Sequence, residues 1–260
     1  MLSILLMFTS IFLWAYSIPL ILIMILIGVP IAMPLFAAAL LTSTYLKLIY
    51  KHPIQKSSIR TFINNLDFTY WFGDIDRVKI PSETHLITSH PHNIFCLGAL
   101  LCIHFQPKSE TLIAVAPMIF HVPFIGWIAA KVGCIPSSKK SIKNALSSGM
   151  SVILIPGGVP EVVTYEKNKI YTQRYGFLNF NVPILPVITT SKHYFVPETP
   201  LYDLRIFIAK RYHIPIIFPW IFGWKNTWLP KRKSVTVKVL EVKKRTHEEY
   251  FKTIKEHIYK

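Results

Sequence analysis

The stretch HLITSHPHNIFCLGALLCIHF, from His85 to Phe105, joins two kinds of apolar segment through a short polar turn. Residues 85–90 form a short run bounded by polar residues, which is typical of a buried strand. Residues 93–105 form a longer apolar run, which favours a helix. A strand followed directly by a helix is the first half of a crossover unit, so this stretch predicts a parallel sheet covered by helices.

The same alternation continues along the chain. Further buried strands are predicted at 111–116, 151–156 and 182–190, and helices at 123–132 and 138–148. This order predicts an α/β fold, with a mostly parallel sheet and helices on both of its faces.

The C-terminal part gives two further predictions. Residues 234–242 alternate between apolar and polar side chains, as a half-exposed edge strand does. Residues 246–260 predict a terminal helix, with Thr246 as its cap and Glu249 in the capping-box position. Residues 203–232 are rich in aromatic, proline and basic residues and predict no defined element.

The first part of the chain is apolar and carries no charge before Lys47. A bilayer span needs about 20 apolar residues. Residues 1–50 therefore predict a transmembrane or re-entrant hairpin, with its turn in GVPIAMP, Gly28 to Pro34. Residues 51–84 form a membrane-proximal connector and 85–260 a catalytic domain in this interpretation. The alternative is a buried helical pair in a soluble protein.

The charge of the chain is strongly basic. Lys47, Lys51, Lys56 and Arg60 follow the apolar segment, and basic residues beyond a span mark the cytoplasmic side of a membrane. The net charge of +16 fits membrane lipids or an anionic substrate such as a coenzyme A ester. Nucleic acid is not expected as a partner, because the basic residues are scattered. The sequence is compatible with a homo-oligomer but does not indicate one.

Two candidate sites follow predicted strands. In parallel sheets, ligands bind beyond the carboxyl ends of the strands. The motif SHPHN places His90 and His92 after the strand at 85–90. A neutral imidazole held there can accept a proton from an alcohol, although a pair of polar turn residues is the simpler interpretation. No carboxylate or cysteine cluster accompanies the histidines, so neither a metal nor another cofactor is expected.

The second candidate site is PGGVPE, which follows the strand at 151–156. Gly157 and Gly158 can expose backbone N–H groups to a phosphate or to an oxyanion. Glu161 is an isolated acid, for which a surface salt bridge is the default explanation. Arg174, in QRYGFLNF, could pair with Glu161 or bind phosphate, or simply be solvated. A serine hydrolase is excluded because no G-x-S-x-G motif occurs.

Taken together, these motifs resemble the type-two diacylglycerol acyltransferase family, which includes monoacylglycerol and wax-alcohol acyltransferases. HPHN resembles the family's His-Pro-His-Gly signature. APMIFHVPFIGWIAAKVGCIPSS, ILIPGGVPE and RYGF resemble three later family segments, in the same order. The chain departs from the family pattern at Asn93, where glycine is usual, and at Tyr175, where lysine is usual; it is also shorter than typical members.

The resemblance implies a membrane enzyme of the endoplasmic reticulum or lipid droplets, with its catalytic part in the cytosol. Its fold should be similar to that of glycerolipid acyltransferases with a His-x4-Asp motif, in which His90 would be the leading histidine. Phe95 stands where that motif has Asp, which leaves Glu161 as the carboxylate that supports the imidazolium. The resemblance implies His90, His92 and Glu161 as catalytic residues. It implies a substrate-binding set of Pro91, Asn93, Gly157, Gly158, Arg174 and Gly176.

The implied reaction moves a fatty acyl group from acyl-CoA, as co-substrate, to a neutral lipid hydroxyl. Diacylglycerol, monoacylglycerol and long-chain alcohols are the candidate acceptors. Two alternatives remain open from the sequence: a lysophospholipid acyltransferase with the same machinery, and a non-catalytic membrane protein that binds lipid.

Overall fold

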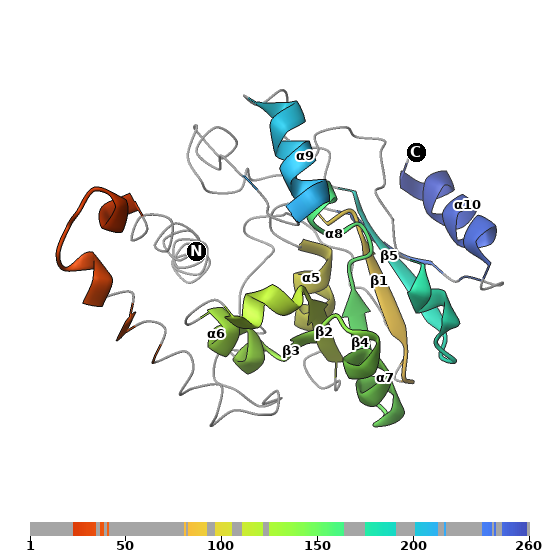
Figure 1. Cartoon of the computed structure of the whole chain (residues 1–260). Coiled ribbons are helices and arrows are strands. Elements are labelled where there is room, and N and C mark those ends of the chain that lie inside the picture. The colour runs from red at the N-terminus through yellow and green to blue at the C-terminus, as the bar shows by residue number, and fades with distance from the viewer. Residues whose placement is uncertain are drawn as a thin grey trace.

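The computed structural model of the chain describes residues 23–34, 37–38, 41, 81, 83–92, 97–105, 111–121, 125–163, 175–190, 201–212, 216, 236–240, 242 and 246–258. In this part of the chain, one six-stranded sheet forms the centre of the fold (Figure 1).

The sheet has the strand order β3-β2-β4-β1-β5-β6. Its strands are β1 (Leu86–His90), β2 (Thr111–Val115), β3 (Cys134–Pro136), β4 (Ser151–Leu154), β5 (Ile184–Thr190) and β6 (Thr236–Val239). The strands β3, β2, β4, β1 and β5 are parallel to their neighbours, and β6 pairs with β5 in the antiparallel direction. The predicted mostly parallel sheet and its edge strand are therefore confirmed.

The helices lie on both faces of the sheet, as predicted. They are α5 (Leu97–Phe105), α6 (Ile125–Val132), α7 (Lys139–Ser147), α8 (Gly158–Val163), α9 (Tyr202–Tyr212) and α10 (His247–Ile258), with the 3-10 turns η1 (Pro117–His121) and η2 (Gly176–Asn179). Successive side chains of a strand point to opposite faces. Leu86 packs in one core cluster with residues of α7, η2 and α10, whereas Ser89 faces α5, where a Cβ at Gly98 would overlap its hydroxyl.

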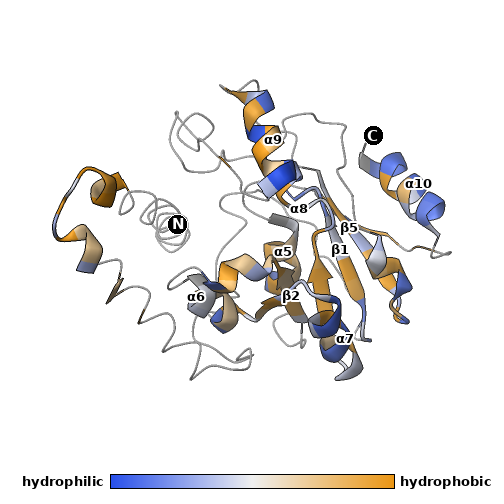
Figure 2. Cartoon of the chain, viewed as in Figure 1, coloured by the Kyte–Doolittle hydropathy of each residue, from blue (hydrophilic) through white to orange (hydrophobic). Residues whose placement is uncertain are grey.

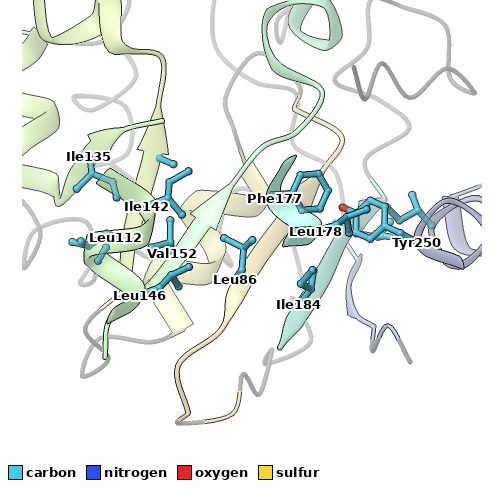
Figure 3. Packing of buried hydrophobic residues seen from close by; sticks show 14 residues of the cluster. Leu86, Leu112, Ile135, Ile142, Leu146, Val152, Phe177, Leu178, Ile184 and Tyr250 are labelled. Atoms are coloured by element: carbon cyan, nitrogen blue, oxygen red, sulfur yellow. The ribbon is translucent and has the colours of Figure 1, made fainter. Parts of the chain in front are cut away.

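The larger core lies on the face covered by α7, η2 and α10 (Figure 3). Leu86, Val152 and Leu112 come from three neighbouring strands and are almost completely buried. Burial of each such side chain contributes about 1.5–3 kcal/mol to the free energy of unfolding. Tyr250 of α10 belongs to this cluster and lies beside Phe177 and Leu178 of η2.

Local signals explain where two of the helices begin. The Ser141 backbone N–H donates to the Ser138 hydroxyl at the start of α7 (3.2 Å). The Glu249 backbone N–H donates to the Thr246 hydroxyl at the start of α10 (3.3 Å). A side chain that accepts from the third helical residue satisfies one of the N–H groups that a helix leaves unpaired, so the predicted cap of the terminal helix is confirmed.

Several elements differ from the sequence predictions. β4 ends at Leu154 rather than at residue 156, and the short helix α8 begins at Gly158, within the glycine-rich segment. Pro160 is compatible with this helix because it lies in the first turn, where a backbone N–H has no partner to lose. The strand β3 is only three residues long and was not predicted. The helix α9 forms in the segment that showed no clear pattern.

The N-terminal region is described from residue 23 to residue 41, with gaps. A helical segment at 23–26 ends at Gly28, which has a φ of +78°. The Val29 N–H donates to the Met24 carbonyl oxygen (2.9 Å) and the Gly28 N–H to that of Ile25 (3.0 Å), which closes the helix with a left-handed glycine. This is the position at which the sequence predicts a turn.

No helix in the described part of the chain is both long and apolar enough to cross a bilayer. Most of the predicted hairpin and of the connector at 51–84 lies outside the described residues. Cys102 and Cys134 are both buried, whereas Cys96 lies outside the described residues.

Candidate functional site

His90 is the last residue of β1, at the carboxyl edge of the sheet. Its side chain is completely buried, on the face that α10 covers. Its Nε2 lies 2.7 Å from the Tyr250 hydroxyl oxygen, in a hydrogen bond whose donor depends on the tautomer. The Thr189 hydroxyl donates to the His90 carbonyl oxygen (3.1 Å). The residue is therefore held through both its ring and its backbone.

Burial decides the protonation state of this pair. Removal from water disfavours a charged imidazole and lowers the pKa of His90 to about 3. Burial also raises the pKa of Tyr250; the Thr88 hydroxyl lowers it, and the charges of Glu161 and Tyr175 raise it further. Both side chains are therefore neutral near pH 7. The His90 Nδ1 is buried and has no hydrogen-bond partner in the described structure, which is uncommon for a polar atom.

Glu161 lies in the first turn of α8 and is 1% exposed. A surface salt bridge, the default explanation from the sequence, is therefore wrong. Its Oε2 accepts a hydrogen bond from the backbone N–H of His92 (2.9 Å). The bond joins the turn after β1 to the helix after β4, as expected for neighbouring parallel strands whose carboxyl ends share one edge.

The glycines at 157 and 158 have different roles in this arrangement. A Cβ at Gly157 would overlap the carboxylate of Glu161, so the absence of a side chain makes room for the acid. Gly158 has a φ of +55°, which side chains other than glycine rarely adopt, and its N–H donates to the Ile155 carbonyl oxygen (3.2 Å). Of the two predicted oxyanion donors, the N–H of Gly157 is therefore the better candidate.

His92 and Pro91 are half-buried, in contrast to His90. A cis peptide bond joins His90 to Pro91. Because the turn continues beyond the buried end of the strand, the side chain of His92 is more exposed than that of His90. Asn93 and Arg174, two of the predicted substrate-binding residues, lie outside the described residues.

The RYGF segment contacts the C-terminal helix. The ring of Tyr175 lies 3.7 Å from that of His247, and the ring of Phe177 lies 5.1 Å from that of Tyr250, both as centroid distances. Gly176 is exposed, with open space where a side chain would be. The segment thus supports the helix that contacts His90, and a substrate-binding role for Gly176 stays a prediction.

Tyr250 is the site residue that sequence reasoning missed. It is separated from His90 by 160 positions, so no local motif links the two. One signal was present: Tyr250 and Ile254 are spaced to share the core-facing side of the terminal helix, and both are buried. A buried tyrosine usually finds a hydrogen-bond partner for its hydroxyl.

This arrangement combines a reachable imidazole, a buried carboxylate and a backbone N–H at one sheet edge. Such a set can remove a proton from a hydroxyl and stabilise the cation that results. Among the described residues, no three side chains of His, Cys, Asp or Glu come together as a metal ion would require.

Comparison with known proteins gives three similarities. A family model described as diacylglycerol acyltransferase matches residues 36–184, more than half of the chain. Diacylglycerol O-acyltransferase 2-like protein 6 of Mus musculus is 30% identical over 128 residues, which cover 42% of this chain and 37% of that protein. The crystal structure of the 1-acyl-sn-glycerophosphate (LPA) acyltransferase PlsC from Thermotoga maritima aligns over 77% of each chain, with 15% identity and a TM-score of 0.49. The family match contains His90, His92 and Glu161 but ends before α10.

Proposed function

Because this chain belongs to the diacylglycerol acyltransferase family, we propose that it transfers a fatty acyl group from acyl-CoA to the hydroxyl of a neutral lipid. The acceptor is diacylglycerol, which gives triacylglycerol, or a monoacylglycerol or long-chain alcohol. The observation that carries this proposal is the buried Glu161 carboxylate bound to the turn that contains the two histidines.

We assign the role of general base to His92. It is half-buried at the sheet edge, whereas His90 is enclosed by the core and bound to Tyr250. A pKa of about 3 makes His90 a weak base at neutral pH, and general bases work best when their pKa lies near the working pH. His90 and Tyr250 act as positioning residues that fix the end of β1 and hence the turn that carries His92.

The reaction needs no covalent enzyme intermediate, because a thioester is already activated. His92 takes the acceptor hydroxyl proton while the oxygen attacks the acyl carbon. The carbon–sulfur bond then breaks, and the departing coenzyme A thiolate recovers the proton from His92. The negative charge of Glu161 stabilises the transient imidazolium, and the Gly157 N–H stabilises the oxyanion.

The proposed location is a membrane. The uncharged segment Met1–Leu46, followed by Lys47 and Lys51, supports an anchored protein whose domain faces the cytosol. The resemblance to the family supports the endoplasmic reticulum or lipid droplets as the location of this protein. A membrane position brings the site to the phase in which both the acyl chain and the acceptor dissolve, which raises their effective concentration.

An acyl-transfer assay tests the proposed function. The full chain in detergent or microsomes is given labelled acyl-CoA with diacylglycerol, monoacylglycerol, a long-chain alcohol or a lysophospholipid, and ester and free thiol are both measured. We expect neutral-lipid esters to form, and ester formation to be lost in the double variant His90→Ala, His92→Ala. A preference for lysophospholipid would identify the other acyltransferase class. Ester formation that is unchanged in the double variant would exclude the base chemistry, and absence of transfer to every acceptor would favour a lipid-binding protein.

A further inference from the structure

The helix α9 buries one charged residue and exposes two of its large apolar residues. Arg205 is 3% exposed, and its Nε donates to the Ile216 carbonyl oxygen (2.7 Å). Ala209, one turn later, is also buried. Leu204 and Phe207 are instead 50% and 58% exposed. A surface helix of a soluble protein normally turns its apolar side chains towards the core, and Leu204 and Phe207 depart from this arrangement.

The exposure of large apolar side chains is not scattered over the fold. Of the eleven large hydrophobic residues that are exposed in the described structure, six lie between residues 23 and 41 and four lie between 201 and 212. Leu204 and Phe207 are three residues apart, which places them on one side of α9, and the exposed Leu201 directly precedes the helix. Single exposed apolar residues are normal on protein surfaces, whereas a continuous row marks an interaction site.

The charged residues on α9 indicate what this row contacts. Lys210 and Arg211 are exposed in the last turn, and Asp203 is exposed in the first. Exposed apolar residues next to basic ones suit a contact with the headgroup region of a bilayer, where lysine and arginine meet anionic lipids. The net charge of +16 favours an anionic surface as the partner.

We propose that α9 is a membrane-docking helix that lies in the bilayer surface through Leu201, Leu204 and Phe207, with Lys210 and Arg211 at anionic headgroups. Figure 2 shows α9 as a mixed apolar and polar helix above α8. Because α9 packs against α8, which carries Glu161, this docking brings the bilayer surface to the candidate site. The docking of α9 does not depend on the proposed reaction. The further idea that docking delivers a lipid acceptor to His92 and Glu161 rests on the proposed function.

Site-specific photocrosslinking tests the docking. Benzoylphenylalanine replaces Phe207 in the full chain, which is reconstituted into phosphatidylcholine vesicles with and without phosphatidylserine. The matched control carries the same probe in place of Lys252, which is exposed on α10. We expect lipid adducts at position 207 and few at position 252. The double variant Lys210→Gln, Arg211→Gln should reduce the adducts in anionic vesicles, by about fivefold for each basic residue, and should not change them in neutral vesicles.

Each other outcome overturns the proposal. Equal lipid adducts at positions 207 and 252 would show that α9 is not a distinct docking surface. Adducts of twice the chain mass would show that a second copy covers this face. Because crosslinking requires no acyl transfer, loss of the proposed function and loss of docking are distinguishable: an inactive protein that crosslinks lipid at position 207 refutes the first and supports the second.

Discussion

His90 and His92 are two positions apart and yet occupy different environments. His90 is enclosed in the core, bonded to Tyr250 and kept neutral, whereas His92 lies half-buried at the sheet edge and its backbone is bonded to Glu161. Because side chains alternate along a strand, the His90 ring lies on the sheet face that α10 covers. His92 lies in the turn that follows and is not part of the strand. We therefore propose different roles for the two histidines.

Glu161 can be tested with a pair of substitutions that separate its charge from its hydrogen bond. In Glu161→Gln, the amide oxygen can still accept from the His92 N–H, so we expect near-normal stability. Loss of about 3 kcal/mol of imidazolium stabilisation would slow ester formation about 10²-fold. In Glu161→Ala, the unpaired N–H should also lower the free energy of unfolding by about 1–3 kcal/mol. Wild-type activity in Glu161→Gln would show that the carboxylate charge is not used.

Tyr250→Phe tests the hydrogen bond to His90. The ring contact with Phe177 remains, while the buried His90 Nε2 loses its partner, so we expect the free energy of unfolding to fall by about 1–3 kcal/mol. Ester formation should slow through the maximal rate rather than through substrate affinity. Tyr212→Phe is the control, because Tyr212 is 59% exposed and should change stability by less than about 0.5 kcal/mol. Equal effects of the two substitutions on unfolding would contradict the role given to Tyr250.

At the scale of elements, the candidate site forms where two segments come into contact, each of which follows one of two neighbouring parallel strands. The turn after β1 supplies the histidines, and α8 after β4 supplies Glu161. The third contribution, Tyr250 from α10, comes from the opposite end of the domain sequence and reaches His90 because α10 packs on the same sheet face. The strand order therefore determines which residues can cooperate.

Gly157→Ala tests the close packing between α8 and the segment before it. The added Cβ would overlap the Glu161 carboxylate, so the acid must move. Strain of this kind in a packed site costs about 1–3 kcal/mol, and we expect ester formation to be lost with it. Gly176→Ala is the stability control, because that position is exposed and open. If thermal unfolding shows the two substitutions to be equally mild, the packing argument is wrong.

These elements also show what the sequence could predict. The strands and the helices that follow them were found because short β-branched runs and longer helical segments have different lengths, and the shared edge of His92 and Glu161 follows from parallel pairing. The sequence does not predict α8, because Gly158 and Pro160 both disfavour helix interiors, although Pro160 lies in the first turn. The sequence does not predict α9, because exposed Leu204 and Phe207 and buried Arg205 break the usual amphipathic pattern, and it does not predict the role of Tyr250, because its partner is distant in sequence.

At the scale of the whole molecule, the fold keeps a titratable group neutral in its core, and this makes stability depend on pH. The folded pKa of His90 is about 3, below the value of 6.5 for the exposed side chain. Below pH 6.5, the unfolded chain therefore binds a proton that the folded chain does not bind. Stability from this group is complete above pH 6.5 and is lost as the pH falls towards 3.

We expect His90 to lower the free energy of unfolding by about 2 kcal/mol between pH 7 and pH 5. Urea unfolding of the wild type in detergent at the two pH values measures the total change. His90→Gln, which keeps a hydrogen-bonding side chain but does not titrate, supplies the reference. The difference in free energy of unfolding between the wild type and His90→Gln should decrease by about 2 kcal/mol from pH 7 to pH 5. If the free energies of unfolding of the two proteins depend on pH in the same way, His90 is not held neutral by burial.

The most direct test of the account compares the two histidines in single-turnover ester formation from labelled acyl-CoA and a neutral lipid alcohol. With rates normalised to folded protein, we predict that His92→Ala slows the chemical step by about 10²–10⁴-fold, whereas His90→Gln retains most of the rate. A His92→Ala protein that forms ester at the wild-type rate, or a folded His90→Gln protein that loses as much as His92→Ala, would contradict the assignment of His92 as the base.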